Sequence, residues 1–231
     1  MFGVEVSLCV VGGGISGLSA AITASQQLQD NTSKRSEKVL LLEKSSTLGG
    51  RVQSDTTTDG YTLDRGFAVF IEEYPFSKKL LNYDELKLGK FVPGSLVKTS
   101  LDGSKGDYAP LHKVADPLRV PSDLLTAVLA PVGTNLDKVK AMRLLFNVFT
   151  NTVDELFEQE ETNTLHCLKH KYGFSDKFIQ EFFEPFLEGI YLSPLQEQSS
   201  RMFHFVFKMF AEGSVTLPEG GMGKFKNVDG N

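Results

Sequence analysis

The first forty residues carry two short apolar runs separated by one helical pattern. Residues 4–11 are rich in valine and leucine and predict a strand, and small apolar residues over 20–24 predict a helix. A second apolar run, 39–42, predicts another strand after a polar stretch at 29–38. A strand, a helix and a strand at this spacing favour a β-α-β unit with parallel strands.

A glycine-rich turn joins the first strand to the helix. Gly12, Gly14 and Gly17 have the spacing G-x-G-x-x-G, with Ile15 and Ser16 between the last two. The first glycine permits a tight turn, the second allows a pyrophosphate to approach the backbone, and the third brings helix and sheet close together. The N–H groups at the start of the helix attract phosphate. We therefore predict a dinucleotide site here; the alternative is a glycine turn in another kind of α/β domain.

An acidic residue, Glu43, follows the second strand, where the ribose hydroxyls of an adenine dinucleotide are held. It lies 26 residues after Gly17, against a usual spacing of about 20. The polar insert at 29–38 accounts for the excess if it loops out. We include the neighbouring Lys44 in the predicted cofactor site.

The segment Leu48-Gly49-Gly50-Arg51 comes next. Joined to the glycine turn and Glu43, it resembles the flavin amine oxidase superfamily, which includes amine oxidases, protoporphyrinogen oxidases and phytoene desaturases. The resemblance implies FAD, with Gly49, Gly50 and Arg51 along the cofactor. The planar guanidinium of Arg51 suits a phosphate.

A further segment, Asp64-Arg65-Gly66, has the form D-x-G that lies against the flavin ring in this superfamily. The resemblance places Gly66 and Phe67 at the ring. The alternative is a strand-turn-strand edge with an incidental glycine.

The resemblance implies an α/β fold: a Rossmann-type, glutathione-reductase-like FAD-binding βαβ domain with an inserted α+β substrate domain. Members of the superfamily are considerably longer, so this chain resembles their N-terminal half and the fold is expected to be incomplete at its C-terminus. We expect residues 1–71 to form the FAD-binding part. Residues 72–231 are expected to form a mostly helical substrate part with a β-hairpin, its last residues returning towards the FAD domain.

Periodicity after residue 72 predicts mainly helices. The helix that Thr134 caps is expected to carry one apolar stripe, formed by Val139, Met142, Leu145, Phe146 and Phe149. Pro185 is expected to limit a helix that Ser175 begins. A hairpin is expected between 96–99 and 109–111. Further helices are predicted at 74–81, 123–129, 153–157, 164–172 and 200–212. The segments 183–194 and 199–223 strengthen the family resemblance.

Composition limits the classes of partner and the cellular location that we expect for the chain. The net charge is −5, so no basic patch suggests nucleic acid. No run of about 18 apolar residues predicts a membrane span. Of the two cysteines, Cys9 is expected to be a buried free thiol, and a reducing compartment is the default. No leader precedes the first strand, so the cytoplasm is the expected location; a plastid or another organelle stays open if the N-terminus is incomplete. Oligomeric state is not predicted.

Two other groups of residues do not indicate a functional site. His166, Cys167 and His170 lie at helical spacing, but a structural zinc needs four ligands, so no metal site is predicted. The aromatic residues Phe203, Phe207 and Phe210 favour a core over a substrate wall.

The function predicted is an FAD-dependent oxidoreductase that removes hydride from an apolar small molecule of the amine, polyene or porphyrinogen class, with no catalytic side chain assigned. One alternative is a truncated, non-catalytic FAD-binding fragment or interaction protein. Another is an NAD(P)-dependent enzyme, which the segment 49–51 disfavours; Glu43 also disfavours the phosphate of NADP.

Overall fold

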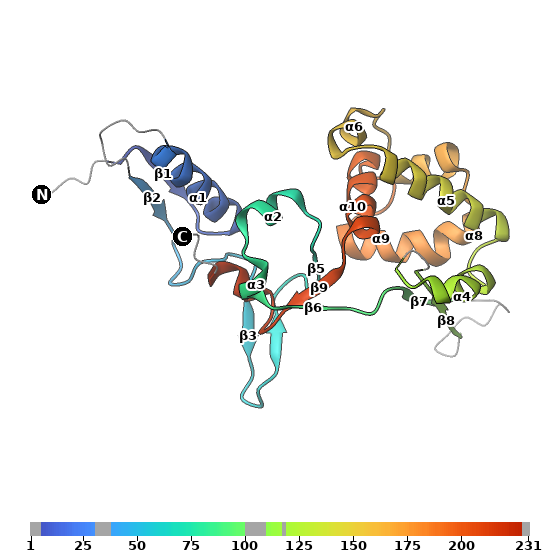
Figure 1. The fold of residues 1–231 in the computed structure, drawn as a ribbon, viewed down its shortest axis with the longest axis horizontal. Coiled ribbons are helices and arrows are strands. Elements are labelled where there is room, and N and C mark those ends of the chain that lie inside the picture. The colour runs from blue at the N-terminus through green and yellow to red at the C-terminus, as the bar shows by residue number, and fades with distance from the viewer. Residues whose placement is uncertain (1–5, 31–37, 100–109, 117–118, 228–231) are drawn as a thin grey trace, which may run out of the picture. The chain divides into compact units, whose positions relative to one another are not determined.

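The computed structural model describes residues 6–30, 38–99, 110–116 and 119–227 (Figure 1). The chain forms two compact units. Unit 1 comprises Met1–Phe91 and Val215–Asn231, and unit 2 comprises Val92–Ser214. Unit 1 is therefore built from two stretches of chain separated by unit 2. The assignment of a cofactor part and a substrate part stays a prediction.

Unit 1 begins with the β-α-β arrangement that the sequence predicts. Strand β1 (Leu8–Val11) leads into helix α1 (Ile15–Asp30), and β2 (Val39–Leu42) returns parallel to β1, with Leu8 opposite Val39 and Val11 opposite Leu42. Helix α1 packs against both strands (Figure 1). The chain is thus a mixed α/β protein with a parallel βαβ unit at its start.

The first strand differs from its prediction in one respect, because the thiol of Cys9 is exposed. Val10 faces α1, since a Cβ added at Gly17 would lie 3.5 Å from its Cγ1. Side chains alternate along a strand, so Cys9 points to the opposite face. Among the described residues, β1 pairs with β2 alone, and Val11 is 81% exposed.

The described residues of unit 1 also form two antiparallel sheets. Strand β3 (Ser54–Thr56) pairs with β4 (Thr62–Asp64). Strand β9 (Val215–Pro218) lies between β5 (Phe70–Ile71) and β6 (Leu88–Lys90), with the short helices α2 (Pro75–Leu80) and α3 (Tyr83–Leu86) nearby in sequence (Figure 1). The fully buried Thr216 donates its hydroxyl to the carbonyl of Phe70 at 3.0 Å. Unit 1 therefore depends on residues from both of its stretches of chain.

A polar clasp ties the β3–β4 pair to the turn after β9. The carboxylate of Asp64 accepts from the hydroxyl of Ser54 and, at 2.8 Å, from the amide of Met222. The amide of Gly223 donates to the Ser54 oxygen at 2.7 Å. Gly221 has a φ of +87°, and a Cβ there would lie 2.6 Å from that same oxygen. The clasp thus has no room for a side chain at Gly221.

We predict that Gly221→Ala destabilises unit 1 by about 2–4 kcal/mol, because it adds a steric clash to an unfavourable backbone conformation. Gly60→Ala is the matched control, since Gly60 has a φ of +86° but nothing within 4 Å of an added Cβ. It should cost only about 1–2 kcal/mol. Urea unfolding with hydrogen exchange of the β3–β4 amides measures both, and equal losses would contradict the clasp.

Among its described residues, unit 2 contains one two-stranded sheet and a set of helices. Strands β7 (Ser95–Lys98) and β8 (Leu111–Val114) pair antiparallel, as the predicted hairpin requires; its turn at 102–106 lies outside the described residues. The α-helices are α4 (Leu124–Leu129), α5 (Asn135–Thr150), α6 (Val153–Glu158), α7 (Thr164–His166), α8 (Asp176–Phe178), α9 (Glu184–Tyr191) and α10 (Ser200–Glu212). Phe203 of α10 is fully buried in the core, and Phe207 packs against that core, as predicted.

The predicted end of a helix at Pro185 is wrong. After α8 the chain makes a π-helical turn, Ile179–Phe183, and continues directly into α9, with Pro185 in its first turn. Proline is tolerated in the first turn of an α-helix, where its missing N–H has no intrahelical partner. The wider π turn thus lets the helical path pass the proline.

The apolar stripe of α5 is present but faces solvent. Its fully buried apolar residues are Leu144 and Val148, which belong to the core beside α10. The stripe residues Val139, Met142 and Phe146 are exposed, Phe146 by 70%. Two apolar faces compete on this helix, and the one with Leu144 and Val148 forms the core.

A buried polar cluster lies within the helices of unit 2. The hydroxyl of Tyr172 is 2.8 Å from Nε2 of His204 and accepts from Asn147 at 3.0 Å, while Sγ of Cys167 lies 3.6 Å from the same Nε2. Nδ1 of His204 is buried and makes no hydrogen bond. Burial, with a smaller contribution from Lys171, lowers the pKa of His204 to about 4. Burial likewise raises the pKa of the Cys167 thiol to about 11, so the cluster is neutral at pH 7.

This lowered pKa predicts an acid-sensitive stability. Between pH 6.5 and about 4 the unfolded chain binds a proton at His204 that the folded chain does not, so the free energy of unfolding falls as the pH falls. The full change is of the order of 3 kcal/mol. His204→Gln retains polarity without titration, and its unfolding free energy should lack this component in urea titrations across the window. Parallel pH profiles of parent and variant would refute the prediction.

Candidate functional site

The glycine turn after β1 is held by backbone contacts. The amide of Gly12 donates to the carbonyl of Leu42 at 2.8 Å, and Gly12 has a φ of +105°, which favours glycine. A Cβ at Gly17 would lie 1.8 Å from the carbonyl oxygen of Gly12. The third glycine is therefore required because helix α1 starts in direct contact with the turn.

Gly14 differs from its two neighbours in the motif. Its φ lies outside the left-handed region, and the nearest atom to an added Cβ is 4.0 Å away. The carbonyl of Gly14 accepts from Leu18, so the first turn of α1 contains Ile15 and Ser16, both exposed. The N–H groups of this turn have no partner inside the helix. The protein's own packing does not require a glycine at 14, but a ligand that approaches the backbone there would.

The predicted second loop lies directly beside this turn. The amide of Gly49 donates to the carbonyl of Gly13 at 2.8 Å, and Gly49 forms an isolated parallel bridge with Gly14. Gly50 has a φ of +60°, and a Cβ there would lie 3.1 Å from Cα of Gly14. Segments more than thirty residues apart in sequence thus form one backbone surface.

Glu43 directly follows β2 and binds the glycine turn itself. One carboxylate oxygen accepts from the amide of Gly13 at 2.6 Å, and the other accepts from the amide and hydroxyl of Ser45, both at 2.8 Å. These hydrogen bonds, led by the Ser45 amide, lower the pKa of Glu43 to about 2. Glu43 is consequently ionised at neutral pH and able to accept hydrogen bonds from hydroxyl groups.

The remaining predicted site residues are arranged less closely. A Cβ at Gly66 would lie 3.6 Å from the carbonyl of Arg51, so these two backbones are adjacent. The side chains of Arg51 and Lys44 are exposed, and Phe67 is 63% exposed. The structure brings the glycines, Glu43 and the backbone of residue 51 together, and it leaves these three side chains at the surface.

One contributor, Ser45, was missed in the sequence analysis. Ser45 fixes the Glu43 carboxylate, and a Ser two residues after an acid, as in this turn, is a local signal that could have indicated it. The Asp64 of the D-x-G segment serves the clasp with Ser54 and Met222, while Arg65 pairs with Asp55 at 2.6 Å. Met222 lies 158 residues from Asp64, so no local pattern reveals this partner.

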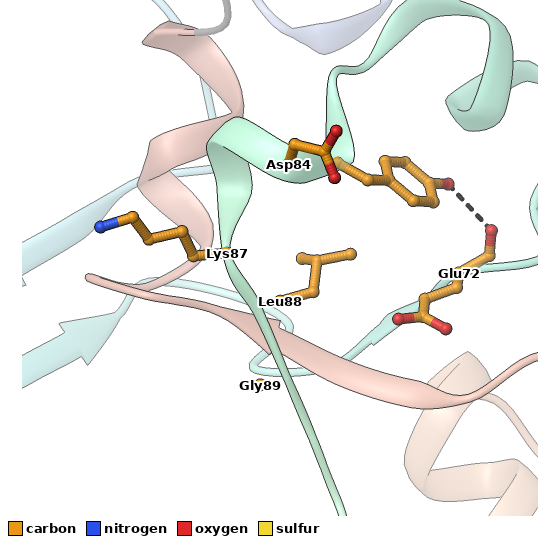
Figure 2. A pocket seen from close by; sticks show the side chains of 6 residues that line it. Glu72, Asp84, Lys87, Leu88 and Gly89 are labelled. Atoms are coloured by element: carbon orange, nitrogen blue, oxygen red, sulfur yellow. Dashed lines mark hydrogen bonds between the residues drawn. The ribbon is translucent and has the colours of Figure 1, made fainter.

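A shallow depression of about 520 Å³ lies elsewhere in unit 1 (Figure 2). The hydroxyl of Tyr83 donates to the carbonyl of Glu72 at its edge, at 2.9 Å. Its other lining residues are Asp84, Lys87, Leu88 and Gly89. None of the predicted cofactor residues lines it, so it adds nothing to that site.

The described part of the chain holds neither a cluster of metal ligands nor a membrane-spanning helix. No group of three or more His, Cys, Asp or Glu side chains is placed to hold a metal ion, although the rings of His166 and His170 lie 4.5 Å apart. Within the same part of the chain, no helix has the length and apolar character needed to cross a membrane.

Solved structures share the fold. An oxidoreductase from Methanosarcina mazei matches 96% of this chain and 47% of its own chain, with a TM-score of 0.62 and 17% identity. A protein from Pyrococcus furiosus matches with the same coverage, a TM-score of 0.53 and 16% identity. At these identities the likeness shows the fold alone. The chain spans about half the length of either structure, and no curated protein matches the sequence.

The fold is of the mixed α/β class, and its parallel βαβ unit carries two glycine loops that lie side by side. A family model described as flavin containing amine oxidoreductase matches residues 15–227. The chain therefore belongs to the flavin-containing amine oxidoreductase family, which confirms the predicted resemblance. FAD, the cofactor predicted from the sequence, is the cofactor that this family implies.

We predict that substitution by alanine has a large effect on stability at Gly17 and a small effect at Gly14. Gly17→Ala should destabilise unit 1 by about 2–4 kcal/mol, because its methyl group collides with backbone. Gly14→Ala should change the unfolding free energy by less than about 1 kcal/mol. Urea unfolding with hydrogen exchange of the α1 amides reports on both. A stable Gly17→Ala variant would show that the turn is not packed as described.

Proposed function

We propose that the loops around Gly14 and Gly49 bind the pyrophosphate of FAD, and that the chain acts as the cofactor-binding part of an oxidoreductase. The observation that carries this proposal is the open space over Gly14, bordered by the first turn of α1 and by the bridge to Gly49. Backbone N–H groups at a helix start stabilise phosphate charge. The residues present therefore fit the cofactor that the family implies.

Each predicted site residue then has a role. Gly12 and Gly17 shape the turn, while the amides of Ile15 and Ser16 face the phosphates. Glu43, ionised and held by Ser45, accepts from the ribose hydroxyls.

The outer residues of the site contribute positive charge and contacts to the flavin ring. Arg51 is exposed and able to swing onto the pyrophosphate, Lys44 adds positive charge near Glu43, and Gly66 with Phe67 lies at the ring end. Within this scheme residues 1–71 form the cofactor part and 72–231 the substrate part.

The proposed reaction is hydride removal from an apolar small molecule of the amine, polyene or porphyrinogen class. When bound, FAD supplies the hydride acceptor. The chain's own residues bind and orient the cofactor, and no side chain is assigned as acid or base. The family membership supports this reaction class.

A second candidate is a chain that binds FAD without turnover, or that serves as an interaction partner. The exposed apolar residues of β1 and β2, such as Val11, favour it, because a two-stranded parallel sheet normally has further cover. The two candidates separate experimentally. A chain that binds FAD without turnover retains the flavin, but only the first candidate bleaches the flavin absorption when apolar amines or polyenes are added without oxygen.

We predict that the purified chain binds added FAD and shows a flavin absorption band after gel filtration. Gly14→Val should weaken FAD binding by tenfold or more, or about 1.4 kcal/mol, because the side chain fills the phosphate space. Glu43→Ala should weaken it by about ten- to a hundredfold through loss of charged hydrogen bonds.

The control for these variants is Gly189→Val, since nothing lies within 4 Å of an added Cβ at that position in unit 2. It should bind FAD like the parent. Equal binding by Gly14→Val would refute the site. If NAD, and not FAD, protected the chain against thermal unfolding, the site would be assigned to a nicotinamide cofactor.

A further inference from the structure

The carboxylate of Glu43 has an inner and an outer oxygen. Oε2, the inner oxygen, accepts from the amide of the buried Gly13 at 2.6 Å. A Cβ added at Gly13 would lie 3.0 Å from Oε2 and 2.6 Å from Cδ2 of Leu48, so both side chains cover the turn at this point. Oε1, the outer oxygen, contacts the exposed residue Ser45. A ligand hydroxyl that approaches from solvent is therefore expected to reach Oε1.

The outer oxygen already has two donors, and both belong to Ser45. Its amide and its hydroxyl each donate to Oε1 at 2.8 Å. The two oxygens of a carboxylate share about four acceptor positions, or about two each. A further donor at Oε1 consequently has to replace one of the two from Ser45. The amide is part of the backbone of the turn, whereas the hydroxyl can rotate about a single bond.

A second acceptor lies within reach of the same hydroxyl. The carbonyl oxygen of Thr47 is 2.6 Å from Oγ of Ser45. A serine hydroxyl has one proton, so it donates fully either to Glu43 or to Thr47. The charged carboxylate is the stronger acceptor, and the carbonyl is a neutral one. The Ser45 hydroxyl thus has two positions: one occupies Oε1 and the other leaves it open.

We propose that Ser45 controls the access of a ribose hydroxyl to Glu43. In the free protein its hydroxyl occupies Oε1. When a ribose hydroxyl of the adenosine donates there instead, the Ser45 hydroxyl turns to the carbonyl of Thr47. This replacement of one donor by another, the hydroxyl exchange, leaves every proton on its own oxygen. The inference rests on the proposed function, because it concerns the adenosine end of the proposed cofactor site.

The hydroxyl exchange makes Ser45 a positioning residue that acts through Glu43. Ligands with a ribose hydroxyl can drive the exchange, and ligands without one leave Oε1 occupied. The exchange also has a cost, since a charge-assisted hydrogen bond within the protein is replaced by a neutral one. Removal of the Ser45 hydroxyl should therefore strengthen the binding of a ribose, although it removes a contact of the free protein.

ADP is a suitable probe, because it is the part of FAD that carries the ribose hydroxyls and a pyrophosphate. Ser45→Ala should bind ADP about three- to tenfold more tightly than the parent, since ADP no longer has to displace the hydroxyl. The analogue 2′,3′-dideoxy-ADP lacks both ribose hydroxyls and should bind to the two proteins equally. Isothermal titration calorimetry measures all four affinities. If Ser45 only supported the loop, both ligands would respond alike.

Two variants serve as controls. Ser45→Thr retains a hydroxyl and should bind both ligands like the parent. Ser46→Ala alters the neighbouring exposed serine and should also leave both affinities unchanged. Circular dichroism checks that all variants are folded.

Glu43→Ala separates this proposal from the proposed function. If the parent binds ADP and Glu43→Ala weakens that binding, the adenosine site is present whatever Ser45→Ala does. An unchanged or weaker affinity of Ser45→Ala for ADP would then overturn the hydroxyl exchange alone, and so would equal gains with ADP and 2′,3′-dideoxy-ADP. If the parent bound FAD but not ADP, the hydroxyl exchange would be overturned and the proposed function would stand. If it bound neither, both would be wrong.

Discussion

The contact between helix α1 and the turn that precedes it is the constraint on which the candidate site depends. Because α1 starts against the carbonyl of Gly12, only glycine fits at position 17. The carboxylate of Glu43 then fixes Gly13, and Gly13 in turn accepts the amide of Gly49. Three loops are thus positioned by backbone groups, with few side chains involved.

The two units use polar groups in opposite ways. In unit 1 hydrogen bonds such as those of Asp64 and Glu43 join loops at or near the surface. In unit 2 the pair Tyr172 and His204 lies inside the helical core and is neutral. A buried network of this kind contributes specificity of packing, at the cost of sensitivity to protonation.

Sequence reasoning succeeds here where the signal is local. The parallel βαβ unit, the cap at Thr134 and the family follow from spacings within short windows. It fails where tertiary contacts determine which face of a helix is buried or where a helix ends. Periodicity showed that α5 is amphipathic but could not tell which of two apolar faces is buried, and a π turn let the helix continue past Pro185. Met222, which donates to Asp64, lies beyond any local window.

The central place of β9 between β5 and β6 has a consequence for how the chain acquires its structure. The bond from Thr216 to Phe70 spans 146 residues, so this sheet of unit 1 cannot close until Thr216 has left the ribosome. Unit 2 is continuous in sequence and is synthesised before that point. Because β9 follows unit 2 in the sequence, β5 and β6 stay without their central strand while all of unit 2 is being made.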